Sequence, residues 1–165
     1  MFQVGDFIVY GNNGACQVKA ISTPGLDPET PDRRYYTIQP VCGTETIYRP
    51  VDSKVFMRPV MSKGEAEDLI SRIPDISETP LETKDLHILT DSYRQVFLSH
   101  DCGQLVQLIK TTYRKNRTAV QNGKKPSEID ARFRKKAEEL LHGELSVALG
   151  IPVENVPQYI ESKIS

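Results

Sequence analysis

Histidine and cysteine, the residue types that most often ligate metals or act as nucleophiles, are few in this 165-residue sequence. There are three of each: His87, His100, His142, Cys16, Cys42 and Cys102. No two of them have the CxxC or HExxH spacing that brings two ligands to one metal, and the sequence has no GxGxxG and no P-loop for a nucleotide. We therefore expect no enzymatic activity, no metal and no cofactor.

The cysteine count is odd, and without a CxxC pair it is typical of reduced thiols in the cytoplasm. No apolar run approaches the roughly 20 residues of a membrane span, and the N-terminus lacks the basic and apolar regions of a secretory signal. We expect a cytoplasmic protein that contacts no membrane and no small-molecule substrate. A small enzyme or sensor that uses one of the three thiols is an alternative hypothesis, which normal function after replacement of all three would exclude.

Charge is distributed unevenly along the chain, although the formal net charge is only −1. Residues 1–58 are neutral, residues 59–109 carry −5 and residues 137–165 carry −4. Residues 110–136, with ten basic and two acidic side chains, carry +8. Nucleic-acid binding follows such a local field and not the sum over the chain.

The basic segment has helical geometry as well as charge. Four residues at helical spacing form an apolar stripe: Leu105, Leu108, Ile109 and Thr112. Three cations lie on the opposite side: Lys110, Arg114 and Arg117. A helix here can bury the stripe and present a cationic ridge to solvent.

A second basic cluster follows on the next predicted helix. It consists of Arg132, Lys135 and Lys136, beside a core stripe of Ile129, Phe133, Ala137, Leu140 and Leu141. Lys124 and Lys125 lie in the connecting loop. One basic helix face is more often a solvated surface, but two consecutive basic helices with a basic loop favour phosphate binding.

Glu144 falls near this second core stripe, where a carboxylate requires a partner. We expect a structural hydrogen bond or an ion pair with another helix, and no catalytic role.

Short strands are expected in the first 60 residues, where β-branched and aromatic residues alternate with turn residues. The expected strands cover residues 7–10, 15–21, 35–38, 45–49 and 55–57, with a turn at 11–14 and a proline-bearing loop at 22–32. Several short strands at this spacing are typical of a small closed barrel, which leaves no sheet edge exposed.

From Ser62 onward the hydrophobic period changes from two to about 3.6. Ser62 and Glu65 form a capping-box pattern. The expected helices run from Ser62 to before Pro74, over 83–98, from Asp101 to about 120, from 126 to 149, and briefly from Pro152. The sequence thus predicts an α+β protein, with a small β-barrel in residues 1–60 and an all-α domain in residues 61–165.

Motifs at both ends of the chain are shared with one known family. They are Phe2-x-Val4-Gly5-Asp6-x-x-Val9-Tyr10-x-x-x-Gly14, Tyr35-Tyr36-x-Ile38, Ile47-Tyr48-Arg49-Pro50-Val51 and the segment AEELLHGELSVAL at residues 137–149. In this order and spacing, the chain resembles the CarD family of bacterial transcription regulators over nearly its whole length.

The resemblance implies a Tudor-like or SH3-like barrel, shared with the transcription-repair coupling factor, that binds the RNA polymerase β subunit. It implies polymerase contacts at Tyr48 and Arg49. It also implies that the helical domain touches promoter DNA at the upstream edge of the melted bubble, with Arg94 and Lys136 at matching positions. Such a protein stabilises the open complex by binding one state more tightly than another. A module that binds polymerase without DNA contact is the alternative.

The family places a tryptophan at the start of its second helix, where it wedges into the DNA minor groove, but this chain has no Trp. Leu89 stands at that position when Tyr93 and Arg94 are aligned with the family's aromatic–basic pair. A leucine can wedge between base steps; a core role beside Tyr93 is the alternative, and Ile88 is the other apolar candidate. The predicted DNA-binding residues are therefore Leu89, Arg94, Lys110, Arg114, Arg117, Lys124, Lys125 and Lys136.

Overall fold

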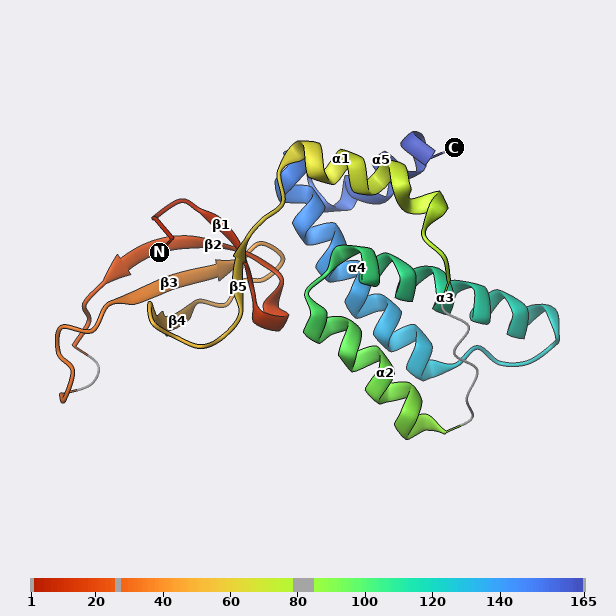
Figure 1. Ribbon diagram of the computed structural model, residues 1–165, viewed down its shortest axis with the longest axis horizontal. Helices are drawn as coiled ribbons and strands as arrows, with labels where there is room; N and C mark the ends of the chain where they lie inside the picture. The colour runs from red at the N-terminus through yellow and green to blue at the C-terminus, as the bar shows by residue number, and fades with distance from the viewer. Residues whose placement is uncertain (1, 26–27, 79–84, 165) are drawn as a thin grey trace.

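The computed structural model describes residues 2–25, 28–78 and 85–164, which form a β-sheet and a group of helices (Figure 1). The sheet lies at one end of the molecule, in the red to yellow part of the chain, and the helices lie at the other end. This arrangement confirms the predicted α+β fold, with a barrel-like sheet followed by helices.

Five antiparallel strands form the sheet: β1 (Phe7–Tyr10), β2 (Ala15–Ser22), β3 (Tyr35–Pro40), β4 (Ile47–Pro50) and β5 (Met57–Pro59). They are hydrogen-bonded in the order β4-β3-β2-β1-β5. Side chains alternate between the two faces of a strand, so Tyr36 and Ile38 of β3 are buried while their neighbours are half-buried. With Ile8, Tyr10 and Val18 they form a core separate from that of the helices.

Four of the five strands differ from the prediction in their bounds. β2 and β3 end one and two residues later than predicted, at Ser22 and Pro40, and β4 and β5 each begin two residues later. β4 begins at Ile47 and not at residue 45, because the Glu45 side chain still folds over Gly43 in the preceding turn. β5 begins at Met57, opposite Tyr10, because β1 ends at Tyr10 and the chain enters a 3-10 turn at Gly11. The sequence also predicted that the sheet closes into a barrel, which requires its two edge strands to pair. Between the strands that the structure describes, β4 and β5 share no ladder and stand at the two edges.

After the sheet, the described residues form five α-helices: α1 (Lys63–Arg72), α2 (Leu86–Ser99), α3 (Cys102–Gln121), α4 (Glu128–Leu149) and α5 (Val156–Ile164). Short 3-10 turns lie at Gly11–Asn13, Ile73–Asp75 and Val153–Asn155. The expected capping box is confirmed, since Ser62 and Glu65 bond each other's backbone N–H groups. Asp101 and Ser127 are the N-caps of α3 and α4. The prediction for α2 began at residue 83, outside the described residues; the helix starts after its N-cap, Asp85.

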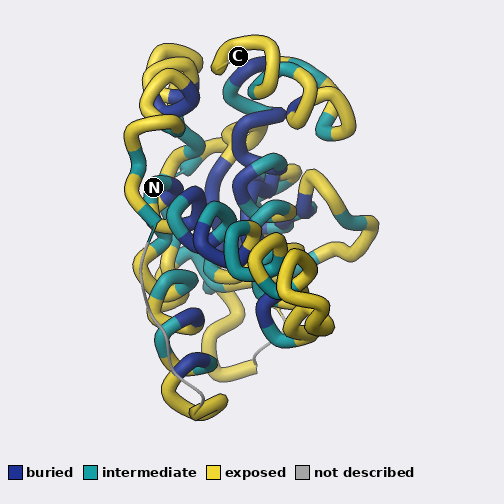
Figure 2. The backbone as a smooth tube through the Cα atoms, turned by 90° about the vertical axis from the view of Figure 1, so that its right-hand side faces the viewer, coloured by how far each residue is buried: buried dark blue, intermediate teal, exposed yellow. Residues whose placement is uncertain are grey.

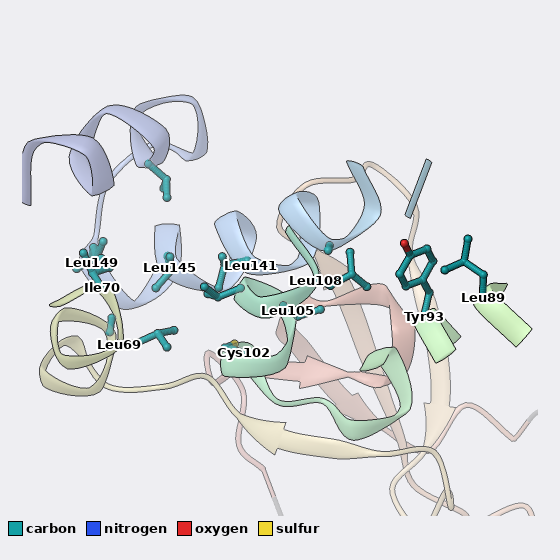
Figure 3. Packing of buried hydrophobic residues seen from close by; sticks show 14 residues of the cluster. Leu69, Ile70, Leu89, Tyr93, Cys102, Leu105, Leu108, Leu141, Leu145 and Leu149 are labelled. Atoms are coloured by element: carbon teal, nitrogen blue, oxygen red, sulfur yellow. The ribbon is translucent and has the colours of Figure 1, made fainter. Parts of the chain in front are cut away.

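The helical core extends along α4. Figure 2 shows the buried segments gathered in the interior of this part, with exposed turns around them. The core side chains run from Ile70 and Leu149 at one end, past Leu145 and Leu141, to Tyr93 and Leu89 at the other (Figure 3). This continuous apolar row holds α4 against α1, α2 and α3, and so fixes the surfaces that these helices present.

Candidate nucleic-acid interface

A groove of about 500 Å³ lies between α2 and α4, beside the turn that joins β1 to β2. Its basic lining residues are Arg94 of α2 and Arg132 and Lys136 of α4. Its other lining residues are Asn12, Phe97, Leu98, Phe133 and Leu140. No acidic residue of the described chain lines it. The groove thus combines a cationic rim with an apolar floor.

Helical spacing brings the cations together. Arg132 and Lys136 are four residues apart and therefore share one face of α4. All three cationic side chains are exposed at the surface, and the Arg132 guanidinium lies 5.4 Å from the centre of the Phe133 ring in a cation–π contact. Guanidinium and ammonium groups bind phosphate oxygens, while an apolar floor accepts sugars or bases.

Aromatic packing forms the floor. The rings of Phe97 and Phe133 stack with centroids 5.9 Å apart, and Tyr93 lies tilted against Phe133 at 5.1 Å. These contacts join α2 to α4 directly beneath the rim. The spacing between the rim cations on the two helices is therefore set by packed rings and not by flexible side chains.

A buried polar cluster lies under the same floor. The Tyr93 hydroxyl donates a 2.6 Å hydrogen bond to Asp130, and the Lys115 ammonium lies 3.0 Å from that carboxylate. Burial, followed by the hydrogen bond and the negative charge of Asp130, raises the pKa of Tyr93 above its ordinary value. One residue each from α2, α3 and α4 is thus held in a single charge-assisted cluster.

Leu89 lies in the helical core beside Tyr93, where it is only 4% exposed (Figure 3). This is the second of the two roles considered for it from the sequence. Ile88, by contrast, is 53% exposed. Insertion of Leu89 into DNA would require it to leave the core, whereas Ile88 is already at the surface.

The cationic ridge expected on α3 is not presented to solvent as a whole, and this part of the prediction is corrected. Lys110 donates hydrogen bonds to the carbonyls of Ile73 and Ile76, at 2.9 Å and 2.7 Å, and Arg114 forms a 2.8 Å ion pair with Glu78. Two of the three ridge cations therefore hold the segment that follows α1. These contacts could not be predicted from the sequence, because the partners lie more than 30 residues away.

The remaining predicted cations, Arg117, Lys124 and Lys125, are exposed at the end of α3 and in the loop before α4. They do not line the groove that contains Arg94 and Lys136. Arg132 was recognised from the sequence as part of a basic cluster but was not among the predicted contacts, although its i,i+4 spacing to Lys136 was a usable signal. Asn12 could not be found from local sequence, because it reaches the groove from the sheet.

The predicted polymerase contacts lie on β4, an edge strand of the sheet. β4 pairs with β3 through Tyr48 opposite Thr37 and Arg49 opposite Tyr36. Tyr48 is 55% exposed, and Arg49 is also exposed. The opposite edge of β4 carries no ladder to another described strand.

Glu144 is buried and paired, as expected, but its partner was predicted on another helix and lies elsewhere. The carboxylate meets Arg58 of β5, a strand residue 86 positions earlier in the chain. A hydrophobic period identifies a buried position but not the element that packs against it, so the sequence could not identify this partner.

The pKa of each of the three thiols is raised above its ordinary value. Burial, followed by the charges of Glu45 and Cys42, raises the pKa of Cys16 to about 12. Burial, with Glu139, raises the pKa of Cys42, and burial, with Glu144, raises that of Cys102. A raised pKa disfavours the thiolate that acts as a nucleophile or sensor. Among the described residues, no three His, Cys, Asp or Glu side chains are arranged to hold a metal ion.

Within the described ranges, no helix combines the length and hydropathy needed to cross a membrane.

A comparison with protein-family models matches residues 2–61 to the CarD-like/TRCF RID domain, a non-catalytic RNA polymerase-interacting domain. The matched segment holds the whole sheet, from β1 to β5. A search of curated proteins found no match to the chain. The similarity to the CarD-like/TRCF RID domain, which interacts with RNA polymerase, thus covers residues 2–61 and not the helices that follow.

Proposed function

We propose that this protein regulates transcription by docking on the RNA polymerase β subunit through its sheet and by contacting promoter DNA through the groove between α2 and α4. Contact at the upstream edge of the melted bubble would stabilise the open complex, because the protein binds that state more tightly than the closed one. One observation carries this proposal. Arg94 and Lys136, the two positions to which the family resemblance assigns DNA contact, line the same groove together with Arg132.

The chemistry of the groove supports nucleic acid as its ligand. Three exposed cations at the rim can neutralise phosphates, with affinity that falls as salt rises. The rings beneath them offer an apolar surface to a sugar or to an unstacked base. A groove with this rim and floor is suited to DNA whose strands are beginning to separate, where phosphates and base faces are both accessible.

Ile88 is the candidate wedge in place of the family's tryptophan. It is exposed on the first turn of α2, whereas Leu89 is held in the core. An isoleucine can insert between base steps but offers less stacking area than an indole. We therefore expect weak binding to duplex DNA alone, with the polymerase contact supplying a high effective concentration.

Docking on polymerase is proposed at β4. A strand with one unpaired edge can add to a partner's sheet, where main-chain hydrogen bonds give affinity and side chains give register. Tyr48 and Arg49 are the proposed side-chain contacts. Replacement of both, as Tyr48→Ala with Arg49→Glu, should weaken capture of the β subunit. Unchanged capture by a folded variant would show that the contact lies elsewhere.

A second candidate function is a polymerase-binding module without DNA contact. It is favoured by the engagement of Lys110 and Arg114 within the protein, which reduces the cationic surface available to DNA. The two candidate functions differ in whether the groove contacts DNA on a promoter.

The lifetime of the open complex on a linear promoter separates them. The test variant is Arg94→Glu with Lys136→Glu. The control is Lys63→Glu with Lys163→Glu, which makes the same change in charge at exposed positions outside the groove. The test variant should bring the lifetime back to that without the protein, and the slope of DNA affinity against salt should fall by about one for each lost contact. A lifetime equal to that of wild type would favour the module without DNA contact.

A further inference from the structure

The sheet and the helices meet at a buried ion pair. The Arg58 guanidinium of β5 makes two contacts of 2.7 Å with the Glu144 carboxylate of α4. Glu144 is 2% exposed, and it also accepts hydrogen bonds from the Met61 backbone N–H at 2.9 Å and from the Cys102 thiol at 3.1 Å. A bidentate guanidinium–carboxylate pair has a fixed geometry in addition to its energy.

The same arginine also reaches α2. Its guanidinium donates a 3.2 Å hydrogen bond to the carbonyl of His100, the residue that ends α2 with a φ of +52°. The His100 ring in turn stacks on Phe56, which directly precedes β5, with ring centroids 3.9 Å apart and planes 3° from parallel. One side chain of the sheet therefore contacts the C-cap of α2 and the C-terminal part of α4.

These two helices are the walls of the groove. α2 carries Arg94, and α4 carries Arg132 and Lys136. Arg58, Glu144 and His100, together called the joint, thus connect β5 with the two helices that form the walls of the groove. A buried ion pair is weak evidence for stability, because desolvation offsets most of its attraction, but it can select one geometry over others.

We propose that Arg58 and Glu144 are positioning residues that fix the direction in which the sheet presents the groove. This inference rests on the proposed function. A sheet bound to polymerase then delivers the groove to one place on the promoter, which raises the effective concentration at that place. A loose joint would spread the same groove over many orientations and lower that concentration.

Two conservative variants test the joint. Arg58→Lys keeps the positive charge but loses the planar fork that reaches Glu144 and His100 together. Glu144→Gln keeps the shape and removes the charge. The matched control is Arg72→Met, which removes an exposed 3.0 Å ion pair with Asp68 inside α1.

The orientation is measured directly in the full chain. Spin labels are placed at the exposed positions Lys19 of β2 and Lys135 of α4 by Lys19→Cys and Lys135→Cys, with the exposed native thiol removed by Cys42→Ser. We expect one narrow distribution of label-to-label distances for the labelled protein without further changes and for Arg72→Met. Both joint variants should show a broader distribution. A thermal melt confirms that each variant folds cooperatively.

The functional measurements use the unlabelled proteins. In both joint variants, capture of the β subunit and binding to forked DNA without polymerase should equal those of the wild type. Affinity for the polymerase–promoter complex should fall about tenfold or more, a part of the 10²–10⁴ gain that tethering can give. A purely structural role would instead weaken all three together.

Three results would overturn the inference. One is an unchanged distance distribution in both variants, another is a broadened distribution with unchanged affinity for the complex, and the third is a parallel loss of all three binding activities. If the wild type itself does not prolong the open complex, the proposed function fails. The distance distributions then still decide whether Arg58 and Glu144 fix the orientation.

Discussion

Tyr93 of α2 and Asp130 of α4 are joined by a 2.6 Å hydrogen bond, with the phenol as donor. Both residues are buried beneath the groove, and Lys115 of α3 completes the cluster. The cluster therefore holds together the helices whose outer faces carry the rim cations. The shape of the groove depends on this polar cluster as well as on its own lining.

Replacement of the Tyr93 hydroxyl tests that dependence. Tyr93→Phe leaves the buried Asp130 carboxylate with one partner fewer, so the free energy of unfolding should fall by about 1–3 kcal/mol. Urea denaturation measures the change. Tyr113→Phe removes a hydroxyl from a 59% exposed tyrosine and should have no effect. Equal stability of the two variants would contradict a supporting role for the cluster.

Lys110 should behave as a structural residue. Its ammonium caps the carbonyls of Ile73 and Ile76, and hydrogen bonds to charged groups contribute more than neutral ones. Lys110→Met should therefore lower the free energy of unfolding by about 1–2 kcal/mol. It should leave the salt dependence of DNA binding unchanged, in contrast to Arg94→Gln. A smaller dependence of DNA affinity on salt in Lys110→Met would instead show that Lys110 contacts DNA.

A larger wedge should be tolerated at position 88 and not at position 89. Ile88→Trp places an indole at an exposed site on the first turn of α2 and should lengthen the open-complex lifetime, since a larger ring stacks better on an unstacked step. Leu89→Trp overfills the core and should cost about 1–3 kcal/mol of stability. Lifetimes on a linear promoter and urea melts separate the two effects. A longer lifetime for Leu89→Trp alone would mean that this side chain leaves the core on DNA.

Glu144 should make the protein sensitive to acid. Burial opposes its ionisation, but hydrogen bonds from Arg58 and Met61 outweigh this and hold its pKa below the ordinary value of 4.5. A depressed carboxylate pKa contributes stability that is complete above pH 4.5 and is lost as the pH falls through the lower folded value. Glu144→Gln should flatten the stability profile below pH 4.5. Parallel profiles for variant and wild type would exclude this contribution.

His142 should make the stability of the protein depend on pH closer to neutrality than Glu144 does. Burial lowers its pKa from the ordinary 6.5, so the unfolded chain takes up a proton first as the pH falls. Stability should therefore decrease as the pH falls below 6.5. His142→Gln removes this titration, and thermal melts between pH 7 and pH 5 should then lose that part of the slope. If the slope of stability against pH is unchanged in this variant, other groups cause the loss of stability.

Local patterns were sufficient to predict most of the fold. The capping box at Ser62 and the caps at Asp101 and Ser127 fixed the starts of three helices, because each motif satisfies backbone groups within one turn. The strand bounds were less exact at Glu45, whose carboxylate lies against Gly43, and at Phe56, since β1 has already ended in a 3-10 turn at Gly11.

The candidate site was harder to predict from sequence. Helical spacing correctly grouped Arg132 with Lys136, but it also assigned Lys110 to a solvent-facing ridge. A helix face that points away from its own core can still meet another segment, and period alone does not show this. The partner of Glu144 was missed for the same reason, since Arg58 is brought to it only by the tertiary fold.

The separation of 86 positions between Arg58 and Glu144 has a consequence during synthesis. At about 5–20 residues per second, the ribosome makes Glu144 roughly 4–17 s after Arg58. Throughout that interval the nascent chain has the strands, with their own core of buried side chains, but not the carboxylate that pairs with Arg58. A growing chain therefore exposes the β4 edge, the proposed docking site for polymerase, before Arg58 and Glu144 can pair and set the direction of the groove.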